Sequence, residues 1–188
     1  MWCTKCNIET NENVCPVCGS QTADDLPVDV YWCDSCCVPV IQVTNQLDKG
    51  ICPICGKATK YISADLRPVF PEERILLELI LEMEPNTLFS KSVWANNNRY
   101  YIDGKSLALH NSIYRDVDSE RISKELGKRQ KELSYNCFEE NIKKFIYANS
   151  TRLNYLKDEA FRFIQEAASK FPEENIVVSF SGGKDSTV

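Results

Sequence analysis

Cysteines are the residues of this sequence whose spacing most clearly implies chemistry. Ten are present, and eight of them form four pairs in which two residues separate the cysteines. A tight turn over such a pair directs both sulfurs at one ion, and two pairs complete a tetrahedral site. The sequence therefore predicts two four-cysteine zinc sites. The ligands are Cys3, Cys6, Cys15 and Cys18 in the first site and Cys33, Cys36, Cys52 and Cys55 in the second.

These sites are expected to be structural, because four thiolates leave no coordination position open for water or a substrate. Rubredoxin-like iron at the same ligands is one alternative, and cysteines scattered through a core without a metal are the other. Cys37 directly follows Cys36 and is an alternative ligand, and the spacing does not decide between them. Cys137 stands alone in a helical stretch, where a buried inert thiol is favoured over a reactive nucleophile.

The overall composition limits the partners, the cellular location and the membrane segments that are expected. The formal net charge is −5, so a nucleic-acid partner would need a local basic face. Paired cysteines suit a metal site better than a disulfide framework, which predicts a cytoplasmic location. The most apolar stretch, 75–83, is short and is interrupted by Glu78 and Glu82, so neither a membrane span nor a signal peptide is expected.

Changes in composition divide the chain into four segments. They are tandem four-cysteine zinc ribbons at 1–60, a small α+β region at 61–116, a helical segment at 117–172, and a last segment with an apolar run and a glycine-containing loop at 173–188. The α+β region should contain a helix beginning at Pro71 and a hairpin turning at 96–98, with a further turn at Asp103-Gly104. Asp118 or Ser119 is expected to cap the first helix of the helical segment.

Ser150 is expected to cap the last predicted helix, which has an apolar stripe. The stripe comprises Leu153, Leu156, Ala160, Phe163, Ile164 and Ala167. The run "NIVVSF" at 175–180 then favours a strand that is buried on both faces, as in a parallel α/β sheet.

The chain ends in a loop whose composition suits phosphate binding. Glycines after a buried strand let backbone amides approach an anion, and the start of the next helix favours negative charge. It is not a Walker A loop, because Val178 and Asp185 occupy positions that require glycine and a hydroxyl residue.

The stretch "SFSGGKDSTV" resembles the PP-loop motif of the ATP pyrophosphatase and phosphoadenylylsulfate (PAPS) reductase superfamily, and most of all its PAPS reductase branch. The resemblance implies that an adenine nucleotide, ATP or PAPS, is bound at this loop. The residues implied are Ser181, Gly182, Gly183, Asp185 and Ser186. The implied fold class is a small α+β zinc-ribbon region and a helical linker that lead into the first strand and phosphate loop of a Rossmann-like α/β domain.

The family's later strands have no counterpart here, so the chain is expected to be the front portion of a longer enzyme. The primary hypothesis is sulfonucleotide or adenylyl-transfer chemistry. One alternative is a tRNA thiolation-type PP-loop enzyme, and another is a non-catalytic zinc-ribbon adaptor that binds a protein or a nucleic acid, tRNA or DNA.

Three other features are interpreted as structural. The basic residues between Arg121 and Lys131 alternate with acids, which favours a solvated helix face over a nucleic-acid surface. Aromatic residues on the predicted hairpin, Trp94, Tyr100 and Tyr101, are expected to pack a small core. His110, the single histidine, is expected to be solvated or hydrogen-bonded, without a metal or catalytic role.

Overall fold

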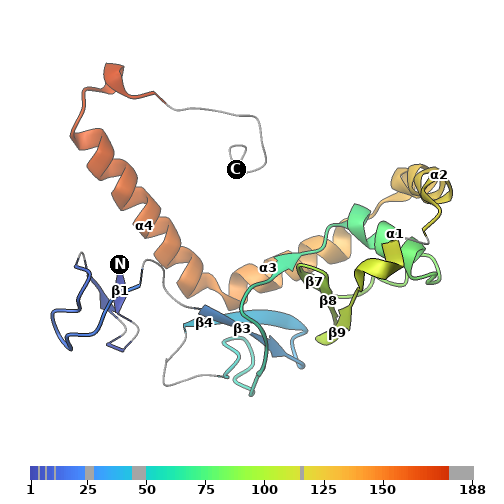
Figure 1. Ribbon diagram of the computed structural model, residues 1–188, viewed down its shortest axis with the longest axis horizontal. Helices are drawn as coiled ribbons and strands as arrows, with labels where there is room; N and C mark the ends of the chain where they lie inside the picture. Colours follow the sequence, from blue (N-terminus) through green and yellow to red (C-terminus); the bar gives the residue numbers. More distant parts are fainter. Residues whose placement is uncertain are drawn as a thin grey trace. The chain divides into compact units, whose positions relative to one another are not determined.

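The computed structural model describes residues 1–177 except 4, 7, 11, 24–27, 44–49 and 115–116. The chain divides into two compact units, Met1–Asn149 and Ser150–Val188. The first unit is a mixed α+β structure that holds both groups of paired cysteines (Figure 1). This agrees with the expected small α+β region that contains cysteine clusters.

Strands and helices alternate irregularly along the first unit. The strands are β1 (Trp2–Cys3), β2 (Ile8–Glu9), β3 (Val28–Cys33), β4 (Val38–Val43), β5 (Lys60–Ser63), β6 (Arg67–Pro68), β7 (Val93–Asn96), β8 (Arg99–Ile102) and β9 (Lys105–Ala108). The helices are α1 (Pro71–Ile80), α2 (Ser119–Arg129) and α3 (Asn136–Ala148), with short 3-10 helices at Asn111–Tyr114 and Gln130–Glu132.

These strands form three small antiparallel sheets with the orders β1-β2, β4-β3-β5 and β6-β7-β8-β9. The predicted hairpin is present, since β7 and β8 pair Asn96 with Arg99 across a two-residue turn. Asp103 and Gly104 form the next turn and both have positive φ angles, 47° and 78°. This is the backbone geometry for which Asp-Gly is favoured in two-residue hairpins.

Helix starts follow the predicted signals. Pro71 is the first residue of α1, and Glu72 and Glu73 lie in its first turn. Both features favour a helix N-terminus, because proline has no amide hydrogen to leave unpaired and acids complement the helix dipole. The Asp118 side chain caps α2 by accepting a hydrogen bond from the Arg121 backbone amide at 3.0 Å.

Aromatic residues connect the β4-β3-β5 sheet to the β6-β7-β8-β9 sheet. Trp32, Trp94 and Tyr101 form one buried cluster, against which Phe145 of α3 packs. Tyr100 lies in a neighbouring cluster with residues of α1. Trp94, Tyr100 and Tyr101 therefore pack a core, as expected from the sequence.

A buried arginine organises the loop that follows α1. Arg74 is only 2% exposed. Its Nε donates to the Val69 carbonyl at 2.9 Å, and its Nη1 donates to the carbonyls of Leu88 and Lys91 at 3.1 and 3.0 Å. Since buried polar groups require partners, these bonds fix the path of the backbone around the helix.

A buried glutamate of α1 also fixes the path of this loop. Glu78 has no exposed surface. Its carboxylate accepts hydrogen bonds from the backbone amides of Asn86 at 3.0 Å and Leu88 at 2.7 Å, and it also pairs with Arg129 of α2. Glu78 thus joins α1, the following loop and α2.

The second unit contains the helix α4 (Ser150–Ser169) and a short 3-10 helix at Glu173–Asn175. Ser150, the residue expected to cap this helix, is its first residue. None of the residues of α4 is buried in the described structure, and Phe163 of the predicted apolar stripe is 72% exposed. Of the predicted strand at 175–180, Asn175 lies in the 3-10 helix, Ile176 and Val177 are exposed, and the rest lies outside the described residues.

Gly104→Ala is expected to destabilise the first unit strongly. A Cβ atom at this position would lie 2.2 Å from Nε1 of the buried Trp32, and the φ angle of 78° is unfavourable for alanine. Overpacking and the left-handed backbone together should lower the free energy of unfolding by about 2–5 kcal/mol. Urea denaturation followed by tryptophan fluorescence would measure the change.

Gly50→Ala is the matched control for that experiment. Gly50 has a similar φ angle of 82°, but its nearest neighbour would be the Thr59 carbonyl oxygen at 3.6 Å, which is an ordinary contact. Its substitution carries the backbone cost without the clash. An equal loss of stability in both variants would contradict a tight fit between Gly104 and Trp32.

Candidate metal centres

The first cysteine cluster is built from β1 and a turn called here the first knuckle, 15–18. Cys3 lies at the end of β1, and Cys15 and Cys18 lie in the knuckle. Gly19 has a φ angle of 69°, and its amide donates to the Cys15 carbonyl at 2.9 Å. Glycine is favoured in this left-handed conformation because it has no Cβ. Both knuckle sulfurs are thereby directed toward Cys3 and Cys6.

The second cluster repeats this construction. Cys33 ends β3, Cys36 lies in the turn before β4, and Cys52 and Cys55 lie in the second knuckle, 52–55. Gly56 again has a φ angle of 69°, and its amide donates to the Cys52 carbonyl at 2.8 Å. The two sites therefore share one local design although their other cysteines come from different elements.

The sulfur positions in both clusters fit an ion with tetrahedral coordination. In each cluster the four sulfurs lie within 4.8 Å of one another. Cys3 and Cys18 are 3.5 Å apart, Cys33 and Cys55 are 3.6 Å apart, and Cys36 and Cys52 are 3.9 Å apart, all measured between Sγ atoms. A zinc–sulfur distance of about 2.3 Å places the ligands of a regular tetrahedron about 3.8 Å apart. Both groups could thus hold a metal ion.

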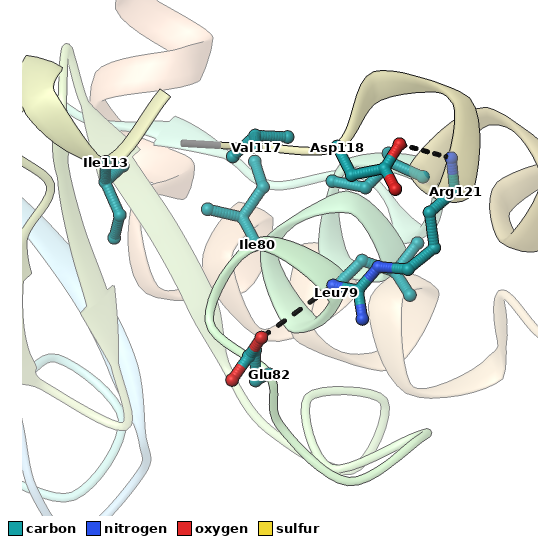
Figure 2. A pocket seen from close by; sticks show the side chains of 8 residues that line it. Leu79, Ile80, Glu82, Ile113, Val117, Asp118 and Arg121 are labelled. Carbon is teal, nitrogen blue, oxygen red and sulfur yellow. Dashed lines mark hydrogen bonds and ion pairs between the residues drawn. The ribbon is translucent and has the colours of Figure 1, made fainter. Parts of the chain in front are cut away.

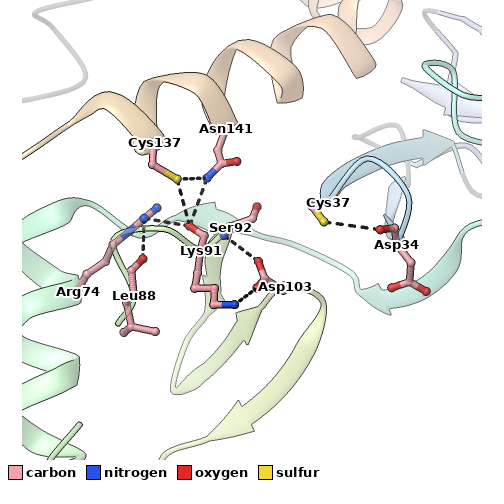
Figure 3. Close-up of polar contacts among 9 residues, drawn as sticks. All are labelled: Asp34, Cys37, Arg74, Leu88, Lys91, Ser92, Asp103, Cys137 and Asn141. Carbon is pink, nitrogen blue, oxygen red and sulfur yellow. Dashed lines mark hydrogen bonds and ion pairs between the residues drawn. The ribbon is translucent and has the colours of Figure 1, made fainter. Parts of the chain in front are cut away.

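Of the two adjacent cysteines, the structure places Cys36 in the second cluster and Cys37 outside it. Cys37 is exposed and has a φ angle of 52°. Its thiol is directed at the Asp34 carbonyl, with the sulfur 3.6 Å from the oxygen (Figure 3). The left-handed backbone conformation at Cys37 directs its side chain away from the second cluster.

Hydrogen bonds favour the deprotonated form of one cysteine in each knuckle. Bonds from the Ser20 side chain and backbone lower the pKa of Cys18 to about 6, and a bond from the Lys57 backbone lowers the pKa of Cys55 to about 7. In contrast, a hydrogen bond with Cys18 raises the pKa of Cys6 to about 12. Burial raises the pKa of Cys36 to about 12. Because a metal binds the deprotonated sulfur, ion binding must displace protons from these crowded thiols.

The second cluster is part of a larger apolar core. Cys33 and Cys52 are fully buried and pack with Val38 and Val40 of β4 and with Ala148 at the end of α3. Asn149 adds polar contacts at the same place. Its Oδ1 accepts from the Ile41 amide at 2.6 Å and its Nδ2 donates to the Pro39 carbonyl at 3.1 Å. The second site is therefore continuous with α3.

The remaining cysteine, Cys137, lies in the first turn of α3 (Figure 3) and belongs to neither cluster. Its sulfur is 3.9 Å from the Lys91 carbonyl oxygen and accepts a hydrogen bond from Asn141 Nδ2 at 3.5 Å. The same carbonyl accepts from Arg74, whose pKa is lowered by burial. The half-buried thiol thus takes part in the contacts that hold α3 against the loop after α1.

A hollow of about 480 Å³, lined by both apolar and charged side chains, lies between the end of α1 and the start of α2 (Figure 2). Arg121 and Glu82 face each other at its edge, with 3.9 Å between the charged atoms. Its lining contains neither cysteine nor histidine. His110 is exposed and belongs to neither cysteine cluster.

The basic residues of α2 are largely neutralised. Arg121, Lys128 and Arg129 pair with Glu82, Glu125 and Glu78, respectively. This supports a solvated helix face there.

The predicted phosphate-binding residues lie outside the described residues. They are Ser181, Gly182, Gly183, Asp185 and Ser186. Their roles therefore remain predictions from the sequence.

None of the helices that the structure describes is both long and apolar enough to cross a membrane.

Comparison with known proteins does not assign the chain to a family. The chain matches no protein-family model, no curated protein and no solved structure.

Proposed function

We propose that both cysteine clusters hold structural Zn²⁺ ions. The support is the donor set, four sulfurs at spacings close to those of a tetrahedron. Such a donor set also accepts iron, so metal analysis of the purified protein distinguishes the two. With all four positions filled by cysteine, the ions would stabilise the fold and would not bind a substrate.

We further propose that the chain is the amino-terminal part of a PP-loop enzyme of the PAPS reductase type. The single observation that carries this proposal is the stretch "SFSGGKDSTV" after an apolar run. In this proposal, backbone amides around Gly182 and Gly183 bind phosphate of ATP or PAPS, and the loop stabilises charge during sulfonucleotide or adenylyl-transfer chemistry. The Rossmann-like domain belongs to the same proposal.

Gly183→Val is expected to abolish adenine-nucleotide binding by the protein expressed from its complete reading frame. A side chain at this position would keep the backbone away from the phosphate. Calorimetric titration with ATP and with PAPS measures the loss, and metal analysis should find both zinc sites still filled. Unchanged nucleotide affinity in the variant would contradict the assignment of the loop.

A zinc-ribbon adaptor is a second candidate function. Two exposed apolar residues, one in each knuckle, favour it. Val17 and Ile54 occupy the same position of the two knuckles and are 72% and 37% exposed. Exposed apolar residues on a rigid turn are suited to contact with another protein. Zinc-loaded protein that binds neither ATP nor PAPS would favour the adaptor over the enzyme.

A further inference from the structure

Two adjoining hollows lie where β5 meets the β7–β8 turn and β9. Their volumes are about 540 and 300 Å³. Both are lined by Tyr61, Ile62, Arg99 and Tyr101, so they lie next to each other, and together they are called here the Tyr61–Arg99 groove. It lies within the first unit and is separate from both cysteine clusters.

Hydrogen bonds between its two walls hold this groove in shape. The Tyr101 hydroxyl donates to the Ile62 carbonyl at 2.9 Å, and Asn96 Nδ2 donates to the Ser63 hydroxyl oxygen at 2.8 Å. Each bond joins β5 to the β7–β8 hairpin. A ligand would therefore meet a preformed surface, which lowers the entropic cost of binding.

The charge of the groove is opposite to that of the chain. The protein has 27 acidic and 22 basic residues, but among the described residues no acidic one lines either hollow, whereas Lys60 and Arg99 do. Arg99 is exposed, and no carboxylate of the described residues forms an ion pair with it. Lys60 pairs with Asp34 at 2.9 Å, and both side chains are exposed, so this weak pair can exchange for a phosphate.

An aromatic ring and amide groups accompany the two cations. Tyr61 is 57% exposed, and an edge-to-face contact with Tyr31, with ring centroids 5.9 Å apart, fixes the position of its ring. The exposed residues Asn97 and Asn98 form the turn at one end of the groove. Exposed aromatic rings stack on bases, and carboxamides can both donate to and accept from base edges.

We propose that the Tyr61–Arg99 groove binds a single-stranded nucleic acid. Tyr61 stacks on a base, Arg99 and Lys60 contact phosphates of the backbone, and the Asn97–Asn98 turn contacts base edges. Separate cationic and aromatic contacts along an open groove are the combination by which proteins bind single strands. The proposal goes beyond the nucleotide loop and uses none of its residues.

Fluorescence anisotropy with labelled oligouridine and oligothymidine strands of about 15 nucleotides tests this proposal. At about 50 mM salt the zinc-loaded protein should bind at least one strand, with affinity that falls as salt increases. Tyr61→Ala should weaken binding about tenfold, whereas Tyr61→Phe should retain it, because stacking needs only the ring. Arg99→Gln should weaken binding and reduce the slope of log affinity against log salt by about 0.7 to 1.

Two controls separate this groove from other causes of binding. Lys124→Gln removes one exposed charge from α2, outside the groove, and should leave affinity nearly unchanged. Gly183→Val should also leave it unchanged, so failure of the nucleotide proposal and failure of this one are distinguishable. Tighter binding of RNA than of DNA would assign a contact to the 2′-hydroxyl. Absence of binding to both strands, or equal weakening by Lys124→Gln and Arg99→Gln, would overturn the proposal.

Discussion

Cys52→Ser is expected to release one of two bound Zn²⁺ ions and to destabilise the first unit well beyond the second knuckle. Cys52 is fully buried and packs with β4 and with Ala148 of α3. Structural zinc sites in small peptides contribute about 10–16 kcal/mol of binding free energy, which acts as folding free energy. Elemental analysis should find one zinc per chain, and hydrogen exchange should show lost protection in both β4 and the end of α3.

Cys15→Ser and Cys37→Ser are the matched comparisons. Cys15→Ser should also remove one zinc, but its effect should stay local, because no ligand of the first site belongs to the three clusters of buried apolar residues found in the described structure. Cys37→Ser should retain both ions, since the exposed Cys37 lies outside the second cluster. Release of both ions by either single ligand substitution would show that the sites are not independent.

The cysteine clusters could be predicted from the sequence because their information is local. Two residues between cysteines and a glycine after the second pair determine the knuckle, and both knuckles have that geometry. Local signals also predicted the start of α1 at Pro71 and the capping of α2 by Asp118. The choice of Cys36 over Cys37 was not predictable, because it depends on the backbone conformation at Cys37.

Contacts between residues that are far apart in the sequence were not predictable, because no local signal marks them. Composition and spacing gave no sign that Asn149 would bind the backbone of β4, since its partner Ile41 is 108 residues away in the sequence. In the sequence, Glu78 interrupts an apolar stretch, which argues against a membrane span. In the structure it is one of the most buried side chains. Amphipathic periodicity does not reveal a buried charge whose partners come from other segments.

The groove proposed for nucleic acid depends on the same kind of distant contact. Tyr61 and Arg99 lie on separate sheets, and no local sequence pattern connects the two residues. The aromatic residues of the hairpin, Trp94, Tyr100 and Tyr101, are buried and pack the core. The exposure of Tyr61 was not predictable, because tertiary structure decides which side chains of an edge strand are exposed.

Glu78→Ala is expected to lower the free energy of unfolding by about 3–5 kcal/mol. The substitution leaves the Leu88 amide without an acceptor in a buried position and removes the charge partner of Arg129, which is itself largely buried. It also removes an acceptor from the Asn86 amide, which releases the loop after α1. Chemical denaturation of the zinc-loaded protein measures the loss.

Glu82→Ala provides the matched control, because Glu82 is one turn further along the chain and its side chain is 81% exposed. Its charged atoms are 3.9 Å from those of Arg121, so the pair should contribute less than about 1 kcal/mol. Both substitutions remove one negative charge, so a change in net charge cannot explain a difference between them. A similar small effect for both would mean that the amides around Leu88 find water or other acceptors when Glu78 is absent. In that case the carboxylate would not hold the loop, and the path of the chain between α1 and β7 would have to depend on Arg74 alone.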